Sequence, residues 1–459
     1  DQPDLKATFK LKVTAPKEWE LISNTSEEDK NIKGKLKEIT FKPTPKISTY
    51  LFHISAGEYV SFEDVYEQEG KKIPLRILCR KSLKKDLLRY VKTERMFKFT
   101  KQGLKFYSEL FDFPYPFEKY DQIFVPEFNM GAMENVGAVS FTERFLFQHE
   151  PTRNELSRLA DIILHEMVHM WFGNLVTMKW WDDLWLNESF ADYLSYYGMT
   201  NATEFKEGWQ SFYSRKAWAY VEDQMRTTHP IAADAPDTDV AFINFDGISY
   251  SKGAAVLKQL MYYLGEDNFI KGIRHYFKKH QWKNTELKDF IHSMETSSGK
   301  SLKAWTDSWI LTTGVNLTRP ECHIHGGKIA ELSLNQEQNK SPLKSHETKI
   351  ALLYESNGKC EVGKEIETTY NVEDTKIREA EGLAEPKIIF TNYQDYDYIQ
   401  AFLDDKSLKY DCNNISKVKD NLTRQMILGS IWQMTRYAEV NPREYLKIVA
   451  ENALGEIFH

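Results

Sequence analysis

The 459-residue sequence contains no run of eighteen consecutive apolar residues, so no segment is long enough to form an apolar membrane-spanning helix. It also lacks a block of basic residues, and its net charge of -7 argues against a nucleic-acid-binding surface. Charged residues make up 28% of the chain and hydrophobic residues 41%, proportions typical of a folded globular protein. A chain of this length is expected to contain about three domains.

Cysteine is scarce, and the four cysteines form no C-x-x-C pair; they are Cys79, Cys322, Cys360 and Cys412. We expect reduced structural thiols, which favours a cytoplasmic protein, while one or two disulfides stay compatible with the sequence. An initiator methionine and a signal peptide are also missing, and a helical pattern still runs from Leu446 to His459. We therefore expect the chain to be the middle part of a longer protein.

What the sequence does contain is a His-Glu-x-x-His pattern at His165, Glu166 and His169. On a helix, residues four positions apart lie on one face, so both imidazoles can bind the same metal ion. The pattern alone also fits an exposed helix with two solvated histidines. The metal site is favoured because the helix is apolar on most sides, and polar groups in a buried helix need partners. The apolar residues are Leu159, Ile162, Ile163, Leu164, Met167, Met170, Trp171 and Phe172.

A third metal ligand is required, because a catalytic zinc ion takes three protein ligands and keeps one position open for water. Glu188, nineteen residues after His169, is the candidate. The segment between them is polar and contains glycine, so the chain can turn back and place a second helix beside the first. A capping box at Thr152 and Glu155 predicts where the first helix begins.

Two further motifs accompany this one. Gly131-Ala132-Met133-Glu134-Asn135 precedes it, and Tyr250 stands shortly before the pair Lys252-Gly253. In type and order the three motifs resemble those of the gluzincin metallopeptidases of the M1 aminopeptidase family, whose signature is H-E-x-x-H followed by eighteen residues and a glutamate. The resemblance covers most of the chain. It implies one zinc ion per chain, with His165, His169 and Glu188 as its ligands.

The resemblance also implies a role for each remaining motif residue. Glu166 would accept a proton from water and pass it to the leaving amine, and Tyr250 would donate a hydrogen bond to the oxyanion. Glu134 would bind the free α-ammonium group of a peptide. The residues around Glu134 would also bind the substrate; they are Met130, Gly131, Ala132, Met133 and Asn135. Main-chain groups of Gly131 and Ala132 would pair with the peptide backbone, and the Met130 side chain would line the pocket for the first side chain of the peptide.

Each of these roles has a simpler alternative. Without its motif, Tyr250 would be interpreted as a packing residue, because the chain contains 24 tyrosines. Glu134 on chemistry alone could equally be a surface glutamate in a glycine-rich turn. Members of the family also use a second residue for the ammonium group, and that residue would lie upstream of Asp1.

The fold expected from these patterns is a multidomain α+β architecture. Residues 1–56 alternate as strands and resemble the end of the family's N-terminal β-domain, with no catalytic candidate of their own. Residues 57–320 resemble its thermolysin-like zincin catalytic domain. Residues 321–410 are expected to form a small β-sandwich, and residues 411–459 the start of a C-terminal α-helical domain. Within the sandwich, the polar segment from Glu365 to Lys387 is expected to be a solvated loop and edge.

The function expected from the resemblance is that of a zinc-dependent aminopeptidase, which hydrolyses the N-terminal residue from peptides with a free N-terminus. Alternatives are a zinc endopeptidase or an epoxide hydrolase of the same family, or a peptide-binding segment without turnover. The sequence predicts no nucleic-acid partner and no membrane segment in this chain. It does not determine the preferred first residue or the oligomeric state.

Overall fold

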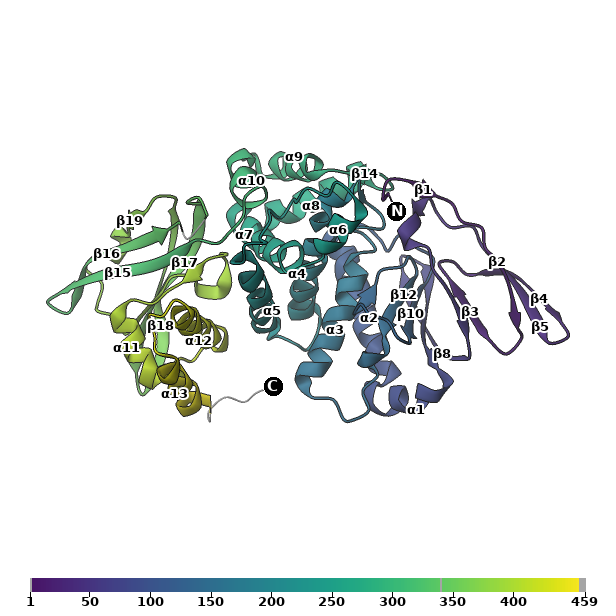
Figure 1. The fold of residues 1–459 in the computed structure, drawn as a ribbon, viewed down its shortest axis with the longest axis horizontal. Helices are drawn as coiled ribbons and strands as arrows, with labels where there is room; N and C mark the ends of the chain where they lie inside the picture. The colour runs from purple at the N-terminus through teal and green to yellow at the C-terminus, as the bar shows by residue number, and fades with distance from the viewer. Residues whose placement is uncertain (1, 339–340, 454–459) are drawn as a thin grey trace.

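The computed structural model describes residues 2–338 and 341–453, and shows a mixed α/β chain of several regions (Figure 1). Strands of the first 57 residues lie at one end of the molecule. Helices fill the middle, and a second group of strands lies with the last helices at the other end. None of the helices in this part of the chain is long and apolar enough to cross a membrane.

The N-terminal region consists of three small antiparallel sheets. Their strands are β1 (Lys6–Ala7) with β6 (Ile47–Ser48); β2 (Lys12–Pro16), β5 (Leu36–Phe41) and β4 (Glu27–Lys33); and β3 (Glu20–Ser23) with β7 (Ile54–Gly57).

Two details of this region differ from what its sequence pattern indicates. The alternating pattern over residues 7–13 predicts one strand, whereas the structure has β1 and β2, because the two halves of the pattern pair with different partners, β6 and β5. The polar residues 24–29 predict a turn, yet strand β4 begins at Glu27. Every residue of β4 is exposed, including its one large apolar residue, Ile32, so this edge strand has no buried apolar face that would distinguish it from a loop.

The middle region is built on a five-stranded sheet in the order β11-β12-β10-β9-β8. Its central strands run parallel, and both outer strands run antiparallel to their neighbours. The strands are β8 (Tyr59–Gln68), β9 (Lys71–Arg80), β10 (Tyr120–Val125), β11 (Ala132–Met133) and β12 (Ala138–Thr142). The short strand β11 therefore forms one edge of the sheet, with its outer side open to a further strand.

Helices cover this sheet and continue beyond it. They are α1 (Lys84–Asp86), α2 (Thr93–Phe111), α3 (Arg153–Val168), α4 (Trp185–Ala202), α5 (Gly208–Asp223), α6 (Thr238–Ile243), α7 (Gly253–Leu264), α8 (Glu266–His280), α9 (Leu287–Ser298) and α10 (Lys303–Trp309), with strands β13 (Thr177–Met178) and β14 (Asn284–Thr285) between them. The pattern over residues 86–111 predicts one helix, whereas the chain breaks at Lys92 (φ 66°) after a π-helical turn.

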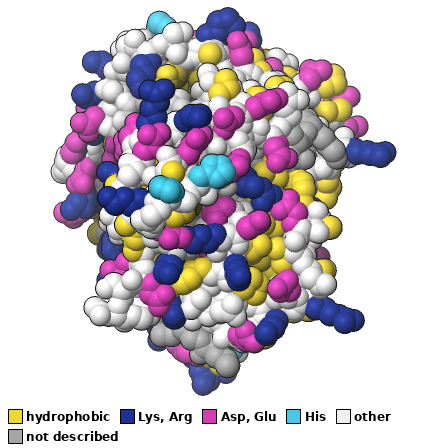
Figure 2. Space-filling view, turned by 90° about the vertical axis from the view of Figure 1, so that its left-hand side faces the viewer, with side chains coloured by type: hydrophobic (Ala, Val, Ile, Leu, Met, Phe, Trp, Pro, Cys, Tyr) yellow, Lys and Arg dark blue, Asp and Glu magenta, His cyan; other side chains and the backbone are white. Residues whose placement is uncertain are grey.

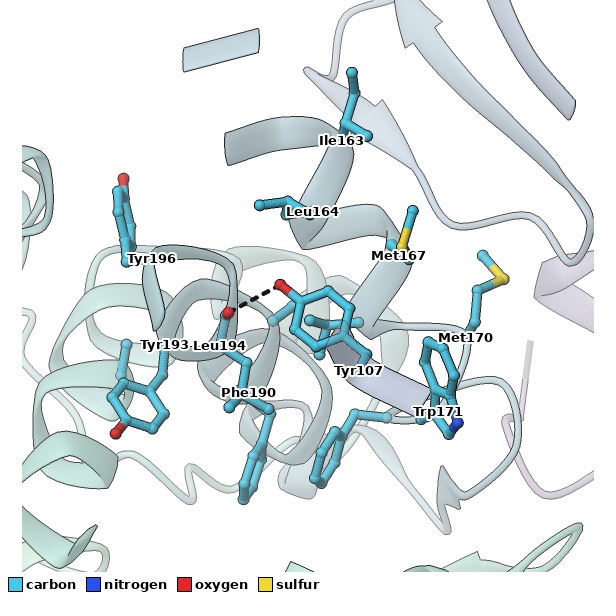
Figure 3. Close-up of a cluster of buried hydrophobic side chains, with 14 of the residues drawn as sticks. Tyr107, Ile163, Leu164, Met167, Met170, Trp171, Phe190, Tyr193, Leu194 and Tyr196 are labelled. Atoms are coloured by element: carbon cyan, nitrogen blue, oxygen red, sulfur yellow. Dashed lines mark hydrogen bonds between the residues drawn. The ribbon is translucent and has the colours of Figure 1, made fainter. Parts of the chain in front are cut away.

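The main hydrophobic core joins helices α2, α3 and α4 (Figure 3). Tyr107 of α2 is fully buried, and its hydroxyl donates a hydrogen bond to the carbonyl oxygen of Leu194 on α4 at 2.9 Å. Met167 and Trp171 pack nearby on and just after α3. This apolar layer fixes the two helices that carry the His-Glu-x-x-His pattern and Glu188.

The C-terminal region contains two further sheets, in the orders β19-β16-β15-β21 and β18-β17-β20. Apolar side chains of both sheets share one core, among them Leu332 and Leu352. The strands are β15 (Leu317–His325), β16 (Lys328–Glu337), β17 (His346–Ser356), β18 (Lys359–Tyr370), β19 (Asp374–Lys376), β20 (Ile388–Phe390) and β21 (Gln400–Ala401). Helices α11 (Asp405–Asn414), α12 (Asn421–Arg436) and α13 (Pro442–Ala453) follow.

The segment from Glu365 to Lys387 is only partly the loop that its polarity predicts. Strand β18 runs through it to Tyr370 and forms the edge of its sheet, and β19 follows at Asp374–Lys376. Acidic and basic side chains alternate over this end of the molecule (Figure 2). The four cysteines are unpaired, as expected for reduced thiols, and the cellular compartment stays a prediction.

Candidate metal centre

Helix α3 carries His165 and Glu166, and His169 is its C-cap residue, directly after Val168. Its first turn has the expected capping box: the Thr152 side chain accepts a hydrogen bond from the Glu155 amide, and the Glu155 carboxylate accepts one from the Thr152 amide. The helix then enters the core, so that both histidines and Glu166 are buried. Polar groups with this burial require partners.

Helix α4 packs beside α3 and brings Glu188 to the two histidines. The Nε2 atoms of His165 and His169 are 3.2 Å apart, and each lies 3.4 Å from Glu188 Oε2. Three potential ligand atoms thus form a nearly equilateral triangle. The structure therefore brings together the three residues that the sequence analysis predicts as metal ligands.

The size of this triangle fits a small divalent ion. Tetrahedral zinc with bond lengths of about 2.0–2.1 Å places its ligand atoms about 3.3–3.4 Å from one another. The two Nε2 atoms approach within hydrogen-bond distance, although neutral imidazoles with both Nδ1 atoms protonated offer only acceptors there. A shared cation resolves this conflict, so the donor set fits a metal ion.

Hydrogen-bond acceptors behind the histidines orient both rings. His169 Nδ1 lies 3.1 Å from the carbonyl oxygen of Phe172, and His165 Nδ1 lies 3.4 Å from Asp192 Oδ1. These contacts direct both Nε2 atoms inward. Asp192 is in turn contacted by Arg215 at 3.3 Å. No motif in the sequence identifies Asp192, although its position four residues after Glu188 places it on the same face of a helix.

The buried charges in this cluster strongly influence one another. Burial raises the pKa of Glu166 to about 8, and its Oε2 atom has no hydrogen-bond partner among the described residues. Burial also acts to raise the pKa of Glu188, but the charges of His169 and His165 lower it to about 2. Glu188 is therefore an anion that two cationic groups or one metal ion can stabilise, whereas Glu166 holds a proton more readily.

The Gly-Ala-Met-Glu-Asn segment lies along the edge of the sheet, next to α3. Ala132 and Met133 form β11, which pairs with β12 on one side only, and the Gly131 carbonyl accepts a hydrogen bond from the Thr142 amide at 3.0 Å. Glu134 follows and is buried. A carboxylate oxygen of Glu134, one of Glu166 and a ring nitrogen of His169 all lie within 4.8 Å of one another.

Asn135 and Met130, two other predicted substrate-binding residues, differ from Glu134 in their surroundings. Asn135 is buried, and its Oδ1 atom accepts a hydrogen bond from Ser140 Oγ at 3.3 Å, within the sheet. Met130, immediately before the Gly-Ala-Met-Glu-Asn segment, is 43% exposed. The substrate-binding roles of both residues stay predictions.

Tyr250 lies on a π-helical turn (Ile248–Lys252) immediately before α7. Its ring is parallel to the His165 imidazole, with centroids 6.1 Å apart. Burial raises the pKa of its hydroxyl well above the usual value, and the negative charges of Glu188 and Glu134 raise it further. The phenol is therefore protonated and can donate a hydrogen bond near the metal ligands.

One residue of the N-terminal region also reaches the site, where the sequence analysis expects no candidate. The Tyr50 hydroxyl accepts a hydrogen bond from Asn187 Nδ2 at 3.1 Å, directly beside the predicted ligand Glu188. No local pattern marks Tyr50, because the contact joins residues 137 positions apart.

Comparison with known protein families agrees with this arrangement. Residues 95–309 match the peptidase family M1 domain, and residues 1–51 match the peptidase M1 N-terminal domain. Together the two matches cover more than half of the chain. The chain belongs to peptidase family M1.

Several family members are clearly similar in sequence. Aminopeptidase N of Streptomyces lividans is 41% identical over 464 residues, which span 98% of this chain and 53% of the relative. The leucyl aminopeptidase of Saccharolobus solfataricus is 35% identical over 386 residues, 82% of this chain and 47% of the relative. A probable aminopeptidase 2 of Sulfurisphaera tokodaii is 35% identical over 371 residues, 78% of this chain and 45% of the relative. The chain thus spans about half the length of these relatives.

Proposed function

We propose that this M1 chain carries the catalytic centre of a zinc-dependent aminopeptidase, in a thermolysin-like domain. The observation that carries the proposal is the position of Glu134, a buried carboxylate close to both Glu166 and His169. A metal site alone would fit many hydrolases. An acidic group beside it gives a peptide's charged N-terminus a binding partner next to the bond that is cut. The names of the relatives support the same activity.

The zinc ion would be held by His165, His169 and Glu188. When bound, zinc acts as a Lewis acid and lowers the pKa of water. Glu166, buried next to the proposed ligand His165, accepts a proton from the attacking water and passes it to the leaving amine nitrogen. Tyr250 donates its hydroxyl hydrogen to the oxyanion of the tetrahedral intermediate.

Substrate orientation follows from the edge of the sheet. The free side of β11 offers main-chain groups to an extended peptide, which would then run towards Glu134. The Glu134 carboxylate binds the α-ammonium group, so the peptide stops there and one residue is released. An acylated N-terminus would leave Glu134 buried without a partner, at a cost of about 1–3 kcal/mol or more.

Aminoacyl anilides test this proposal directly. We expect the zinc-loaded protein to cleave anilides with a free amine, to lose this activity on treatment with a chelator, and to leave N-acetylated anilides intact. Equal cleavage of free and acetylated substrates would indicate an endopeptidase instead. Binding of zinc and of peptides without any turnover would favour a peptide-binding segment.

The role of Glu166 is tested by Glu166→Gln, which keeps the shape of the side chain and removes the base. We expect turnover to fall by about 10²–10⁴-fold while the zinc content, measured by atomic absorption, stays at one ion per chain. Glu150→Gln, at an exposed position before α3, serves as the matched control and should retain full activity. Near-wild-type turnover of Glu166→Gln would mean that another group is the base.

A further inference from the structure

Tyr50 connects the N-terminal region to the residues around the metal ligands. Its hydroxyl accepts the amide hydrogen of Asn187 at 3.1 Å, and its ring meets the Trp181 ring edge-on, with centroids 5.5 Å apart. The hydroxyl is also in hydrogen-bond contact with the Glu134 carboxylate: burial raises the pKa of Tyr50 most, and the Glu134 charge and this contact raise it further. Tyr50 thus stands between Asn187 and Glu134.

The backbone around Tyr50 is clamped to the segment that carries Glu134. Asn24 Nδ2 donates to the carbonyl oxygens of Leu51 at 2.8 Å and of Val136 at 2.9 Å, and its Oδ1 atom accepts the His53 amide at 2.9 Å. One buried side chain therefore ties the residue after Tyr50 to the residue two positions after Glu134. The approach is so close that a Cβ at Gly137 (φ 63°) would lie 2.7 Å from the Asn24 carbonyl oxygen. These contacts fix the distance between the segment that contains Tyr50 and the segment that contains Glu134.

The hydrogen bonds assign a direction to the Tyr50 hydroxyl. Its oxygen already accepts a hydrogen from Asn187, so its own hydrogen is free to be donated. Burial keeps the phenol protonated, and the neighbouring charges of Glu134 and Glu188 act in the same sense. Of the two carboxylates whose charges act on Tyr50, Glu134 is the one that is also in hydrogen-bond contact with the hydroxyl, so it is the acceptor for that hydrogen.

We propose that Tyr50 is a positioning residue for the substrate's terminal ammonium group: it holds one oxygen of Glu134, so that the other is directed at the free amine. This inference rests on the proposed aminopeptidase function and adds a residue of the N-terminal region to the amine site. A fixed carboxylate favours binding, because the rotational freedom of Glu134 need not be lost when the substrate arrives. If Tyr50 only fills space, its ring should suffice without the hydroxyl.

Tyr50→Phe separates these roles, since it removes the hydroxyl and keeps the ring that packs on Trp181. With the zinc-loaded protein and a panel of free-amine aminoacyl anilides, we expect KM to rise about tenfold, the loss typical of one hydrogen bond to a charged group, while kcat changes much less. Zinc content should stay at the wild-type value, and the protein should stay folded at the assay temperature. Tyr66→Phe is the matched control, because Tyr66 is also half-buried against the main core and lies on β8, away from the site.

A second measurement keeps the inference independent of turnover. In the Glu166→Gln background, calorimetry measures the binding of free aminoacyl amides and of their N-acetylated forms. We expect Tyr50→Phe to weaken binding of the free amides about tenfold and to leave the weak binding of the acetylated forms unchanged.

The outcomes separate the two proposals. Binding of free amides that depends on the Tyr50 hydroxyl, without cleavage of any anilide, would reject the aminopeptidase function and support the inference. Cleavage with the same KM in Tyr50→Phe and Tyr66→Phe would reject the inference alone. If the protein neither cleaves anilides nor prefers free amides, both proposals are wrong.

Discussion

Burial determines the protonation state of individual side chains in this protein. His53, which is not one of the predicted metal ligands, is an example. The His53 ring is buried between Ser55, whose Oγ lies 2.8 Å from Nε2, and Ser140, whose Oγ lies 3.5 Å from Nδ1. Burial, together with the positive charge of buried Lys119, lowers the pKa of His53 to about 4; the hydrogen bond with Asn135 and the charge of Asp121 oppose this shift without cancelling it. The ring is therefore neutral in the folded protein at pH 7.

The low pKa of His53 predicts a loss of stability in mild acid. The unfolded chain binds the proton at a pKa of about 6.5, so the contribution of His53 is complete above that pH and is lost as the pH falls towards 4. Over this window the free energy of unfolding should fall by up to about 3 kcal/mol because of this one ring. Urea unfolding at several pH values measures it, with His53→Gln as the variant that cannot titrate.

The comparison of variant and wild type isolates the His53 contribution from the carboxylates that titrate in the same range. His53→Gln should be less stable than the wild type at pH 7.5, and this difference should shrink as the pH falls to 4. His325→Gln, at an exposed position on β15, is the control and should follow the wild type throughout. A constant difference between wild type and His53→Gln would show that His53 is protonated equally in both states.

Among the elements, the spacing between α2 and α4 is set by a glycine. A Cβ on Gly198 of α4 would lie 2.3 Å from the hydroxyl oxygen of Tyr107 and 2.9 Å from its Cζ. Tyr107 is fully buried and bonded to Leu194, so it has no free space to move into. The absence of a side chain at position 198 therefore lets the helix carrying Glu188 approach α2.

Gly198→Ala should consequently destabilise the protein, although alanine is the better helix former. We expect the free energy of unfolding to fall by about 1–3 kcal/mol, the typical cost of overpacking a core. Tyr107→Phe removes the closest atom, so in a double-mutant cycle Gly198→Ala should cost less in the Tyr107→Phe background. Thermal unfolding of the four proteins checks this, and strictly additive costs would contradict the proposed clash.

At the same scale, the sequence predicts long elements better than their interruptions. The capping box correctly predicts the start of α3, because both partners of the cap lie within four residues. The break at Lys92 is not predictable, because the apolar spacing continues across it while the backbone of Lys92 takes a positive φ of 66°. Strand β4 is missed for the opposite reason: it pairs through its backbone and buries no side chain.

For the whole molecule, the sequence motifs identify side chains on α3, α4 and the turn before α7, which the fold then brings to one place. Spacing on a helix makes His165 and His169 predictable as a pair, and the family resemblance supplies Glu188, Glu134 and Tyr250. Tyr50 and Asn24 belong to none of these motifs, and the residues that they contact lie 137 and 112 positions away in the chain. Such long-range contacts can be recognised only in the folded structure, where separate regions of the chain lie together.

A buried ion pair joins the middle and C-terminal regions. Lys216 on α5 and Asp395, which follows β20, are both fully buried, with Nζ and Oδ1 2.5 Å apart. Lys216 also donates to the Asp397 carbonyl oxygen at 3.0 Å. Removing one partner leaves the other charge buried and unpaired, which is costly in a protein interior.

Lys216→Met should therefore weaken the junction as well as the overall stability. We expect the free energy of unfolding to fall by about 3–5 kcal/mol, and calorimetry to resolve separate transitions for the two regions. Lys216→Met combined with Asp395→Leu leaves no unpaired charge and should recover much of the loss. Lys447→Met, in an exposed pair with Glu451, is the control and should change stability by less than about 1 kcal/mol. If the double variant were as unstable as Lys216→Met alone, the cost would lie in the lost contacts of the lysine, such as its hydrogen bond to Asp397, and not in an unpaired Asp395.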